Sequence, residues 1–291
     1  MAEVLKGAPV AAALDEATAS AVLSLKERGI VPALAILRIG ERENDIAYER
    51  SAMKRCAKLG INVRQIILPH DVTQEVLIEN IHALNADASI HGVLMFRPLP
   101  KHLDEAAACI ALTCAKDVDG ITVGSMEKVY SGIGDGFAPC TAQSCMEILK
   151  YYNIDPSGKR AAVIGRSLVI GRPVSMLLMA ANATVTICHT KTVNAAQIAK
   201  EADIVITAAG RGESIGTEYF RAGQTVIDVG INWSETEQKI VGDVRYDEVE
   251  PIVSGITPVP GGVGSVTTAV LASHIAEAAE KASAEFISLA V

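Results

Sequence analysis

The chain has 291 residues, of which 49% are hydrophobic and 4% aromatic, and its formal net charge is −8. A chain of this length buries one large core or two medium ones, and we favour two domains. A composition rich in Gly, Ala, Val and Ile with few aromatic residues is typical of α/β proteins with buried parallel strands. The negative charge argues against nucleic acid as a general partner.

No stretch has the pattern of a signal peptide or of a membrane span, so we expect a cytoplasmic protein that does not bind membranes. The six cysteines form no CxxC pair and no regular framework. This spacing favours reduced, buried thiols over disulfides. Cys188 and His189 are adjacent but have no further ligands nearby, so we expect no metal site.

Strands and helices alternate in the first half of the chain, which predicts βαβ units and a parallel sheet. The segment after Gly120 is rich in glycine, and we expect it to be irregular up to Pro139. The expected elements are helix 10–28, strand 31–39, helix 46–59, strand 62–68, helix 73–85, strand 92–96, helix 103–112 and helix 142–152.

The alternation restarts after a Pro-Gly turn at 155–158, and the second half has the pattern of a dinucleotide-binding half sheet. The expected elements are strand 161–164, helix 173–181, strand 184–188, helix 194–200, strand 203–207, helix 217–221, strand 225–228, helix 246–249 and helix 266–286. The last helix is amphipathic and is expected to pack on the first domain. We therefore predict one domain from 1–140 and 267–291, and a Rossmann-like domain from 141–266.

A strand, a glycine loop and a helix follow one another between Ala161 and Met179. Gly165 allows a sharp turn off the strand, Gly171 keeps the backbone low beneath a ligand, and Pro173 suits a first helical turn. Free amides at the helix start can bind a phosphate. The Gly-x5-Gly spacing differs from the usual dinucleotide fingerprint, so an ordinary βα turn explains this stretch equally well.

Several separated motifs together resemble the methylenetetrahydrofolate dehydrogenase/cyclohydrolase family. They are the glycine loop at 165–173, Lys116-Asp-Val-Asp-Gly120, Pro139-Cys-Thr141, the Pro/Gly-rich loop Thr257-Pro-Val-Pro-Gly-Gly-Val-Gly264, and Tyr48 on an early helix. The resemblance covers nearly the whole chain. It implies a folate-binding domain and a Rossmann domain with a cleft between them, a homodimer, and hydride transfer from the methylene bridge of 5,10-methylenetetrahydrofolate to a nicotinamide.

The resemblance also assigns roles to residues, with Tyr48 and Asp119 as the catalytic pair. Without it, Tyr48 could be a half-buried core aromatic and Asp119 a turn-capping residue. Within the family, Asp119 anchors the pterin and the Tyr48 ring lies in the folate pocket. The expected substrate-binding residues are Tyr48, Phe96, Pro98, Asp119, Pro258, Pro260, Gly261 and Gly262.

Two departures from the family pattern concern the cyclohydrolase reaction. The family carries a Lys one helical turn after the Tyr, whereas this chain has Ala52, and it carries a supporting Gln where this chain has Phe96. Lys54 is rotated away from the Tyr48 face, and Arg55 cannot deprotonate to act as a base. We therefore predict a dehydrogenase with weak or absent cyclohydrolase activity. Ser265, in place of a usual Pro, is a milder difference.

The expected cofactor is NADP, with NAD as the alternative. NAD enzymes usually carry an Asp or Glu after the second Rossmann strand, and this chain has Cys188-His-Thr-Lys191 there. Arg166 with Thr190 could receive a 2′-phosphate, although Arg166 could equally hold a pyrophosphate. The expected cofactor-binding residues are Gly165, Arg166, Ser167, Gly171, Pro173, His189, Thr190, Ala209, Gly210, Gly230, Ile231 and Asp243.

Three other functions are compatible with parts of the pattern. A bifunctional dehydrogenase/cyclohydrolase would retain hydrolysis despite Ala52 and Phe96. A shikimate-dehydrogenase-like enzyme would show a Lys-Asp pair in the first domain instead of Tyr48 and Asp119. A non-catalytic folate or nucleotide-binding module would have lost catalytic residues, but the complete cofactor loop argues against such decay.

Overall fold

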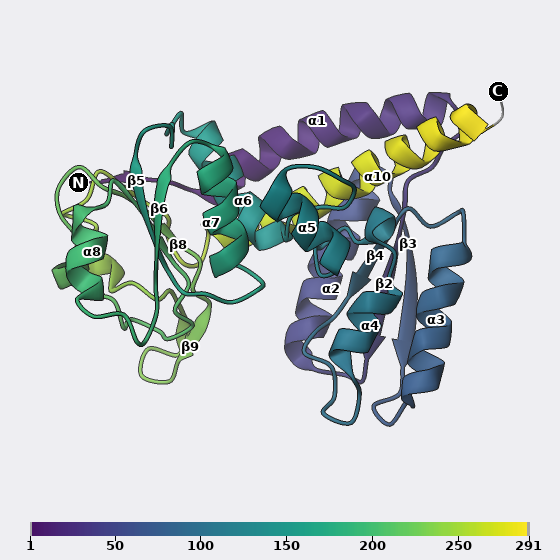
Figure 1. The fold of residues 1–291 in the computed structure, drawn as a ribbon, viewed down its shortest axis with the longest axis horizontal. Coiled ribbons are helices and arrows are strands. Elements are labelled where there is room, and N and C mark those ends of the chain that lie inside the picture. Colours follow the sequence, from purple (N-terminus) through teal and green to yellow (C-terminus); the bar gives the residue numbers. More distant parts are fainter. Residues whose placement is uncertain (1, 290–291) are drawn as a thin grey trace. The chain divides into compact units, whose positions relative to one another are not determined.

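The computed structural model describes residues 2–289, and the chain divides into two compact units. The three-stranded unit comprises Ala13–Cys140 and the chain from Thr268 on. The six-stranded unit comprises the residues up to Ala12 and Thr141–Thr267. Both units are built on parallel sheets with helices (Figure 1). The fold is therefore the predicted two-domain α/β arrangement.

The three-stranded unit has the strand order β3-β2-β4, and both strand pairs are parallel. Every residue of β2 is buried, as expected for a central parallel strand. Its elements are β2 (Ala33–Ile39), α2 (Glu43–Leu59), β3 (Asn62–Leu68), α3 (Gln74–Ala86), β4 (Gly92–Met95), α4 (Glu105–Ala111), the 3-10 helix η1 (Cys114–Lys116), α5 (Val123–Ser131) and α10 (Thr267–Leu289).

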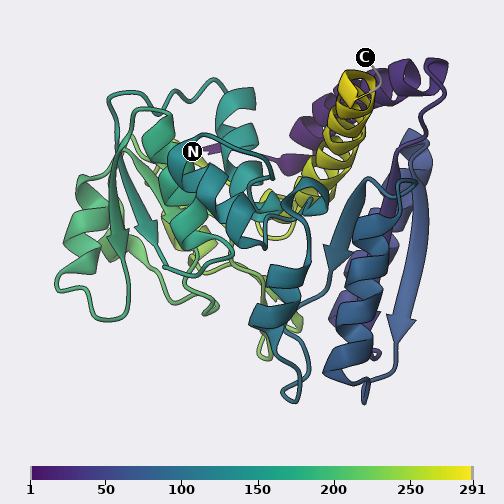
Figure 2. The same cartoon turned by 45° about the vertical axis from the view of Figure 1, so that its right-hand side comes forward.

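Alternating residues of β2 point to opposite faces of this sheet, and the two faces differ. Ala35, Leu37 and Ile39 join an apolar core with Leu77 of α3 and Ala108 of α4. These two helices cover one face of the sheet in Figures 1 and 2. The opposite face receives α2, which makes a buried ion pair from Glu49 to Arg38 of β2.

The C-terminal helix α10 belongs to the three-stranded unit, as predicted for the last helix. It runs beside α1 (Gly7–Glu27) in both views (Figures 1 and 2). Arg28, just after α1, forms an ion pair with Glu280 of α10. Thr268 of α10 accepts a hydrogen bond from Arg55 of α2 at 2.9 Å. Residues from Ala13 on and the C-terminal helix are thus joined within the three-stranded unit.

The six-stranded unit has the strand order β1-β11-β8-β7-β5-β6, with all neighbouring strands parallel. The order around β5 is that of a doubly wound sheet, because β6 lies on one side of β5 whereas β7 and β8 follow on the other side. Its elements are β1 (Glu3–Val4), α6 (Cys140–Tyr151), β5 (Arg160–Ile164), α7 (Gly171–Ala180), β6 (Thr184–Cys188), α8 (Ala195–Glu201), β7 (Ile204–Thr207), η2 (Thr217–Tyr219), β8 (Thr225–Asp228), β9 (Asn232–Ser234), β10 (Lys239–Val241), α9 (Tyr246–Val249), β11 (Gly255–Ile256) and η3 (Val263–Ser265).

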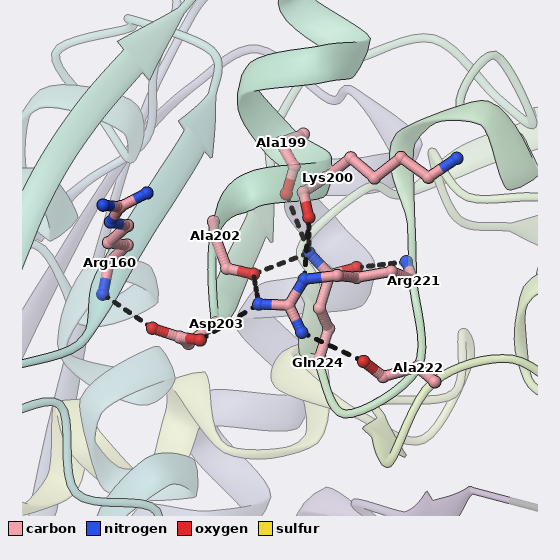
Figure 3. Close-up of polar contacts among 8 residues, drawn as sticks. All are labelled: Arg160, Ala199, Lys200, Ala202, Asp203, Arg221, Ala222 and Gln224. Atoms are coloured by element: carbon pink, nitrogen blue, oxygen red, sulfur yellow. Dashed lines mark hydrogen bonds and ion pairs between the residues drawn. The ribbon is translucent and has the colours of Figure 1, made fainter.

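The C-terminal end of α8 is closed by two side chains from the segment before β8 (Figure 3). The fully buried Gln224 donates from Nε2 to the carbonyl oxygens of Ala199 and Ala202, at 2.8 Å each. Arg221 donates to the carbonyl of Lys200 at 2.9 Å and to that of Ala202 at 3.0 Å. These donors supplement the single backbone bond from the amide of Ala202 to the carbonyl of Ala199 at this helix end.

Several elements differ from the sequence-based expectation. The segment after Gly120 is not irregular throughout, because it contains the helix α5, which Thr122 caps by accepting a hydrogen bond from the amide of Ser125. The short strands β1, β9, β10 and β11 were not expected, since two or three residues carry no readable periodicity. The expected helix 217–221 is the 3-10 helix η2.

The N-terminal residues also group differently from the predicted division. β1 pairs in parallel with β11, so the residues up to Ala12 belong to the six-stranded unit rather than with residues 13–140. Within the described part of the chain, no helix combines the length and apolar character that crossing a membrane requires.

Candidate active site

The residues predicted to bind the pterin lie at the carboxyl edge of the three-stranded sheet. Tyr48 is on α2, which follows β2, and Phe96 directly follows β4. Asp117 forms a parallel bridge with Val93 of β4, so Asp119 is carried along β4 to the same edge. Ligands of open α/β sheets bind at the carboxyl ends of the strands.

The aromatic rings of Tyr48 and Phe96 are in contact. Their centroids are 5.9 Å apart and their planes meet at 84°, an edge-to-face arrangement. Both side chains are half-buried. Pro98, two residues further on, lines a hollow with Arg97 and the N-terminal residues of α2, 42–45. The structure therefore brings Tyr48, Phe96 and Pro98 together in one region.

Asp119 lies in a turn with restricted backbone geometry. Gly120 has a φ of +66°, and a Cβ there would lie 2.5 Å from the nitrogen of Pro139. This close approach joins the Lys-Asp-Val-Asp-Gly motif to the Pro-Cys-Thr motif. Burial raises the pKa of Asp119 to about 6, against a hydrogen bond from Cys140 that lowers it. The nearby Asp117 carboxylate raises that pKa further.

The other members of this motif have structural partners. Lys116 donates from Nζ to the carbonyl oxygens of Leu84, Asn85 and Asp87, which closes the end of α3. The buried Asp117 accepts the amides of Ile121 and Thr122 and the hydroxyl of Ser125. The capping of this turn is thus made by Asp117, which weakens the interpretation of Asp119 as a mere turn cap.

Position 52 is inside the molecule. Ala52 is 1% exposed and lies on the same buried stripe of α2 as Glu49 and Cys56. Lys54 is exposed, in agreement with its rotation away from this stripe. Arg55 bonds Asp15 at 2.5 Å and Thr268 at 2.9 Å, so its guanidinium is held between α1 and α10. Neither cation takes the place of a lysine at position 52.

The residues predicted to bind the nucleotide gather at the carboxyl edge of the six-stranded sheet. The strands β5, β6, β7 and β8 are parallel, so the residues that follow them meet at one edge. The loops concerned contain Gly165, Arg166 and Ser167 after β5, His189 and Thr190 after β6, Ala209 and Gly210 after β7, and Gly230 and Ile231 after β8. The residue after β6 is His189, and no acid follows this strand before α8.

The glycines of the first loop are required by close backbone packing. Gly165 has a φ of +136°, and a Cβ there would lie 2.2 Å from the carbonyl oxygen of Ala208. A Cβ at Gly171 would lie 2.3 Å from the carbonyl oxygen of Gly165 and 2.7 Å from the amide of Arg166. α7 begins at Gly171, and Pro173 is in its first turn. The loop and the helix start therefore form a cradle that only glycine permits.

Asp243 organises a second loop at this edge. Its Oδ2 accepts the amides of Ala209 at 2.6 Å and Gly210 at 3.1 Å, and its Oδ1 accepts the amide of Arg211 and the side chain of Asn232, at 3.0 Å each. With both oxygens occupied, Asp243 is better suited to position this loop than to bind a ribose directly.

Asp228, which was not among the predicted site residues, supports the same loops. Its buried carboxylate accepts the amides of Gly230 at 2.9 Å, Asp243 at 3.1 Å and Val244 at 3.0 Å, together with the hydroxyl of Thr207. Burial raises its pKa to about 6. An acid at the end of the apolar strand Thr-Val-Ile-Asp was the available signal for this role.

The Pro/Gly-rich loop from Thr257 belongs to the six-stranded unit. The other predicted substrate residues, Tyr48, Phe96, Pro98 and Asp119, belong to the three-stranded unit. Pro258 lines a hollow that Asp228 and Gly242 also line. Gly262 packs its carbonyl against Gly7, where a Cβ would lie 2.1 Å from that oxygen. The predicted substrate residues Pro258, Pro260, Gly261 and Gly262 thus share a unit with the nucleotide edge.

Comparison with known families accounts for both units. Residues 5–119 match the catalytic domain of the tetrahydrofolate dehydrogenase/cyclohydrolase family, and residues 139–283 match its NAD(P)-binding domain. The chain belongs to this family. Membership makes the protein an enzyme of the oxidoreductase class, and it removes the shikimate-dehydrogenase-like and non-catalytic alternatives as family assignments.

Relatives of the tetrahydrofolate dehydrogenase/cyclohydrolase family match nearly the full chain. The bifunctional protein FolD of Carboxydothermus hydrogenoformans is 50% identical over 281 residues, covering 96% of this chain and 98% of its own. The crystal structure of the bifunctional FolD of Campylobacter jejuni superposes with a TM-score of 0.93 at 37% identity, covering 97% of this chain and 99% of its own. The Trypanosoma brucei FolD, solved with NADP and an inhibitor, gives 0.90 at 33% identity and covers 96% and 98%.

Proposed function

We propose that the protein oxidises 5,10-methylenetetrahydrofolate to 5,10-methenyltetrahydrofolate by hydride transfer to NADP, with cyclohydrolase activity weak or lost. The family supports the dehydrogenase reaction. The observation that carries the loss of hydrolysis is the buried Ala52 beside the contact between Tyr48 and Phe96.

The folate side of the reaction is assigned to Tyr48, Phe96, Pro98 and Asp119. Ionised, the Asp119 carboxylate can accept hydrogen bonds from the N–H and amino groups of a pterin. The Tyr48 ring offers an aromatic face or edge to the heterocycle, and the Phe96 ring holds it in place. These contacts would orient the methylene carbon, which is what hydride transfer requires of the protein.

The nucleotide side is assigned to the loops at the carboxyl edge of the six-stranded sheet. The close packing at Gly165 and Gly171 sets the loop backbone against the start of α7, where free amides can bind a pyrophosphate. Arg166 is exposed and its guanidinium can bind a 2′-phosphate bidentately, with Thr190 as a second donor. When bound, the nicotinamide supplies the hydride acceptor. The absence of an acid after β6 supports NADP over NAD.

The loss of hydrolysis follows from what position 52 lacks. Adding water to the methenyl carbon releases a proton, and an amine near that carbon could accept it. Ala52 has no such group, Lys54 is exposed, and Arg55 is held by Asp15 and Thr268. Phe96, in place of an amide, offers no hydrogen bond at the other side of Tyr48.

A bifunctional dehydrogenase/cyclohydrolase is the second candidate. The specific observation in its favour is that relatives at 45–50% identity over 96% of this chain are named bifunctional FolD proteins. Their names describe those proteins, and the two candidates make opposite predictions for hydrolysis by this chain.

The deciding experiment measures both reactions with the purified protein. Methylenetetrahydrofolate is supplied with NADP or NAD, and the accumulation of methenyl- or formyl-tetrahydrofolate is followed. We expect reduction of NADP with greater catalytic efficiency than NAD, and methenyltetrahydrofolate as the accumulating product. A rate of methenyltetrahydrofolate hydrolysis comparable to the dehydrogenase rate would establish the bifunctional enzyme instead.

We also infer from the family resemblance that the protein is a homodimer. Size-exclusion chromatography with light scattering tests this directly. A mass of twice 30.6 kDa is expected, and a mass of a single chain at micromolar concentration would contradict it.

A further inference from the structure

A buried ion pair lies beside position 52, and its placement bears on reaction specificity. β2 is an apolar strand except for Arg38, which is 6% exposed. Arg38 donates from Nε to Oε2 of Glu49 on α2 at 2.6 Å, and Glu49 is 5% exposed. Two charges removed from water are costly to bury, even when they are paired. A pair placed here therefore calls for an explanation.

Further contacts fix both members of the pair. Arg38 donates from a terminal nitrogen to the carbonyl oxygen of Gly40, and Gln65 of β3 donates to Oε1 of Glu49. Both carboxylate oxygens of Glu49 thus accept hydrogen bonds, which fixes the carboxylate in one position.

The pair lies in the same region as Tyr48 and Phe96. Leu37 of β2 is opposite Met95 of β4, so the next residues along the two strands are Arg38 and Phe96. Leu37 and Met95 face the apolar core with α3, and the alternation of strand side chains turns Arg38 and Phe96 toward α2. The Phe96 ring there contacts Tyr48, which directly precedes Glu49.

Position 52 is within reach of the Glu49 carboxylate. Ala52 follows Glu49 by three residues on α2, and both belong to the buried stripe of that helix. Side chains three residues apart on a helix are neighbours, and an acid preceding a base at this spacing stabilises the charged base. A lysine at position 52 would therefore meet a fixed carboxylate in a buried setting.

We propose that the Arg38–Glu49 pair is a determinant of reaction specificity, which keeps the site a dehydrogenase by making position 52 unsuitable for a catalytic amine. This inference rests on the proposed loss of cyclohydrolase activity. Hydration of the methenyl carbon forms a C–O bond while the C=N π bond breaks and its electron pair returns to nitrogen. The proton lost by the water passes to a base, so the amine must be neutral to accept it. The Glu49 carboxylate favours the ammonium form, which cannot accept that proton. Restoring Lys at position 52 and Gln at position 96 is then insufficient while Glu49 is charged.

The test compares four proteins: the wild type, A52K/F96Q, R38L/E49L, and the variant that combines all four substitutions. Replacing both members of a buried pair with apolar residues of similar size is often tolerated, whereas removing one member strands the other. Methenyltetrahydrofolate hydrolysis and NADP reduction are measured in parallel, and the thermal midpoint of each protein reports folding.

We expect A52K/F96Q to hydrolyse methenyltetrahydrofolate little faster than the wild type, and the combined variant to gain about tenfold or more, a modest share of what general base catalysis provides. Hydrolysis by the combined variant should also rise with pH as the new amine loses its proton, which a purely structural effect of the pair would not produce. R38L/E49L alone should show no gain.

The proposal is overturned if A52K/F96Q gains as much as the combined variant, or if the folded combined variant gains nothing. Should R38L/E49L fail to fold, A52K/F96Q/R38Q/E49Q removes both charges while keeping hydrogen-bonding groups at positions 38 and 49, and the same gain over A52K/F96Q is required. Rapid hydrolysis by the wild type would instead refute the proposed function, so the two failures are separable.

Discussion

The pKa of Asp119 depends on the burial of its carboxyl group, which the surrounding sequence motif does not reveal. The proposed binding of a pterin by its carboxylate requires the ionised form, and burial raises its pKa to about 6 from an ordinary 3.8. Asp117, two residues earlier, takes the capping contacts of the same turn. The surroundings of the two acids therefore give them different roles: Asp117 caps the turn, and Asp119 has a raised pKa.

The first prediction concerns the pH dependence of the reaction. Because an acid is charged above its pKa, kcat/KM for the folate should fall about tenfold per pH unit below pH 6. D119N should remove this acid limb and lower kcat/KM at pH 7 by about tenfold or more, as expected when a charged hydrogen bond is lost. Rate profiles between pH 5 and 8 provide the measurement.

Cys140 supplies the matched control for that profile. Its hydrogen bond lowers the pKa of Asp119, so C140A should move the acid limb to higher pH. C140S keeps a donor at this position and should leave the limb near its wild-type place. An acid limb that persists unchanged in D119N would assign it to another group.

The second prediction tests the indirect role of Asp243. Its carboxylate holds the amides of Ala209, Gly210 and Arg211, so D243A should disorder that loop. We expect KM for NADP to rise about tenfold or more, with KM for the folate much less affected, since several hydrogen bonds to a charged group are lost. An equal rise in both KM values would contradict a role confined to the nucleotide side.

At the level of elements, short segments depend on side chains that close their ends. α8 is a seven-residue helix, Ala195–Glu201, too short to be stable alone. Its C-terminal carbonyls receive donors from Gln224 and Arg221, which are 19 to 25 residues away in the chain (Figure 3). Tertiary contacts of this kind fix where α8 ends.

The third prediction measures the contribution of this closure. Q224A removes a buried donor from the carbonyls of Ala199 and Ala202, which keep only the amide of Ala202 and the guanidinium of Arg221 as donors, so it should lower the free energy of unfolding by about 1–3 kcal/mol. Gln197 is the control, because it is exposed on the same helix and donates a hydrogen bond to the exposed side chain of Glu201, so Q197A should change stability by less than about 0.5 kcal/mol. Urea unfolding curves of the two variants compare them, and equal midpoints would contradict the assignment.

The fourth prediction concerns the start of α7. A Cβ at Gly171 would lie 2.3 Å from the carbonyl oxygen of Gly165, so G171A should displace the loop from the helix. We expect weaker NADP binding by about tenfold or more, because amides that must approach a phosphate closely are moved away. Fluorescence titration with NADPH measures the affinity. Unchanged binding with normal folding would show that this cradle does not hold the nucleotide.

For the whole molecule, the predicted site residues divide between the carboxyl edges of the two sheets. The family assignment covers both units, and the predicted site residues separate into pterin-side residues of the three-stranded unit and nucleotide-side residues of the six-stranded unit. Hydride transfer needs both, which explains why neither half of the motif set would suffice for the dehydrogenase reaction.

The fifth prediction uses ligand-linked stability of the intact protein. A ligand that binds only the folded state stabilises it by about 2.7 kcal/mol at a concentration of a hundred times Kd. NADP should therefore raise the thermal midpoint more than NAD at equal concentration, and R166A should reduce that difference. Equal midpoints with the two nucleotides in the wild type would remove the argument for NADP.

Much of the architecture follows from local patterns in the sequence. Apolar runs of four to seven residues, such as 33–39 and 204–207, became buried parallel strands, and Gly60 ends α2 in a left-handed conformation. The expectation that the chain is irregular after Gly120 was wrong in part, because the helix α5 forms there. The sequence did not indicate it, since α5 contains Gly124 and Ser125, which are poor helix formers. Its N-cap at Thr122 and the anchoring contacts of Asp117 outweigh that propensity.

By itself, the sequence determined the two βα-repeat regions, the family motifs and the lack of a lysine at position 52, because these depend on residue identity and short-range spacing. Only the tertiary structure decided that Arg38 pairs with Glu49 beside Ala52, that Asp228 and Asp243 hold the loops after β7 and β8, and that Asp117 rather than Asp119 caps its turn. The physical reason is that these contacts join residues on different elements. Their energies come from burial and from partners that no local pattern encodes.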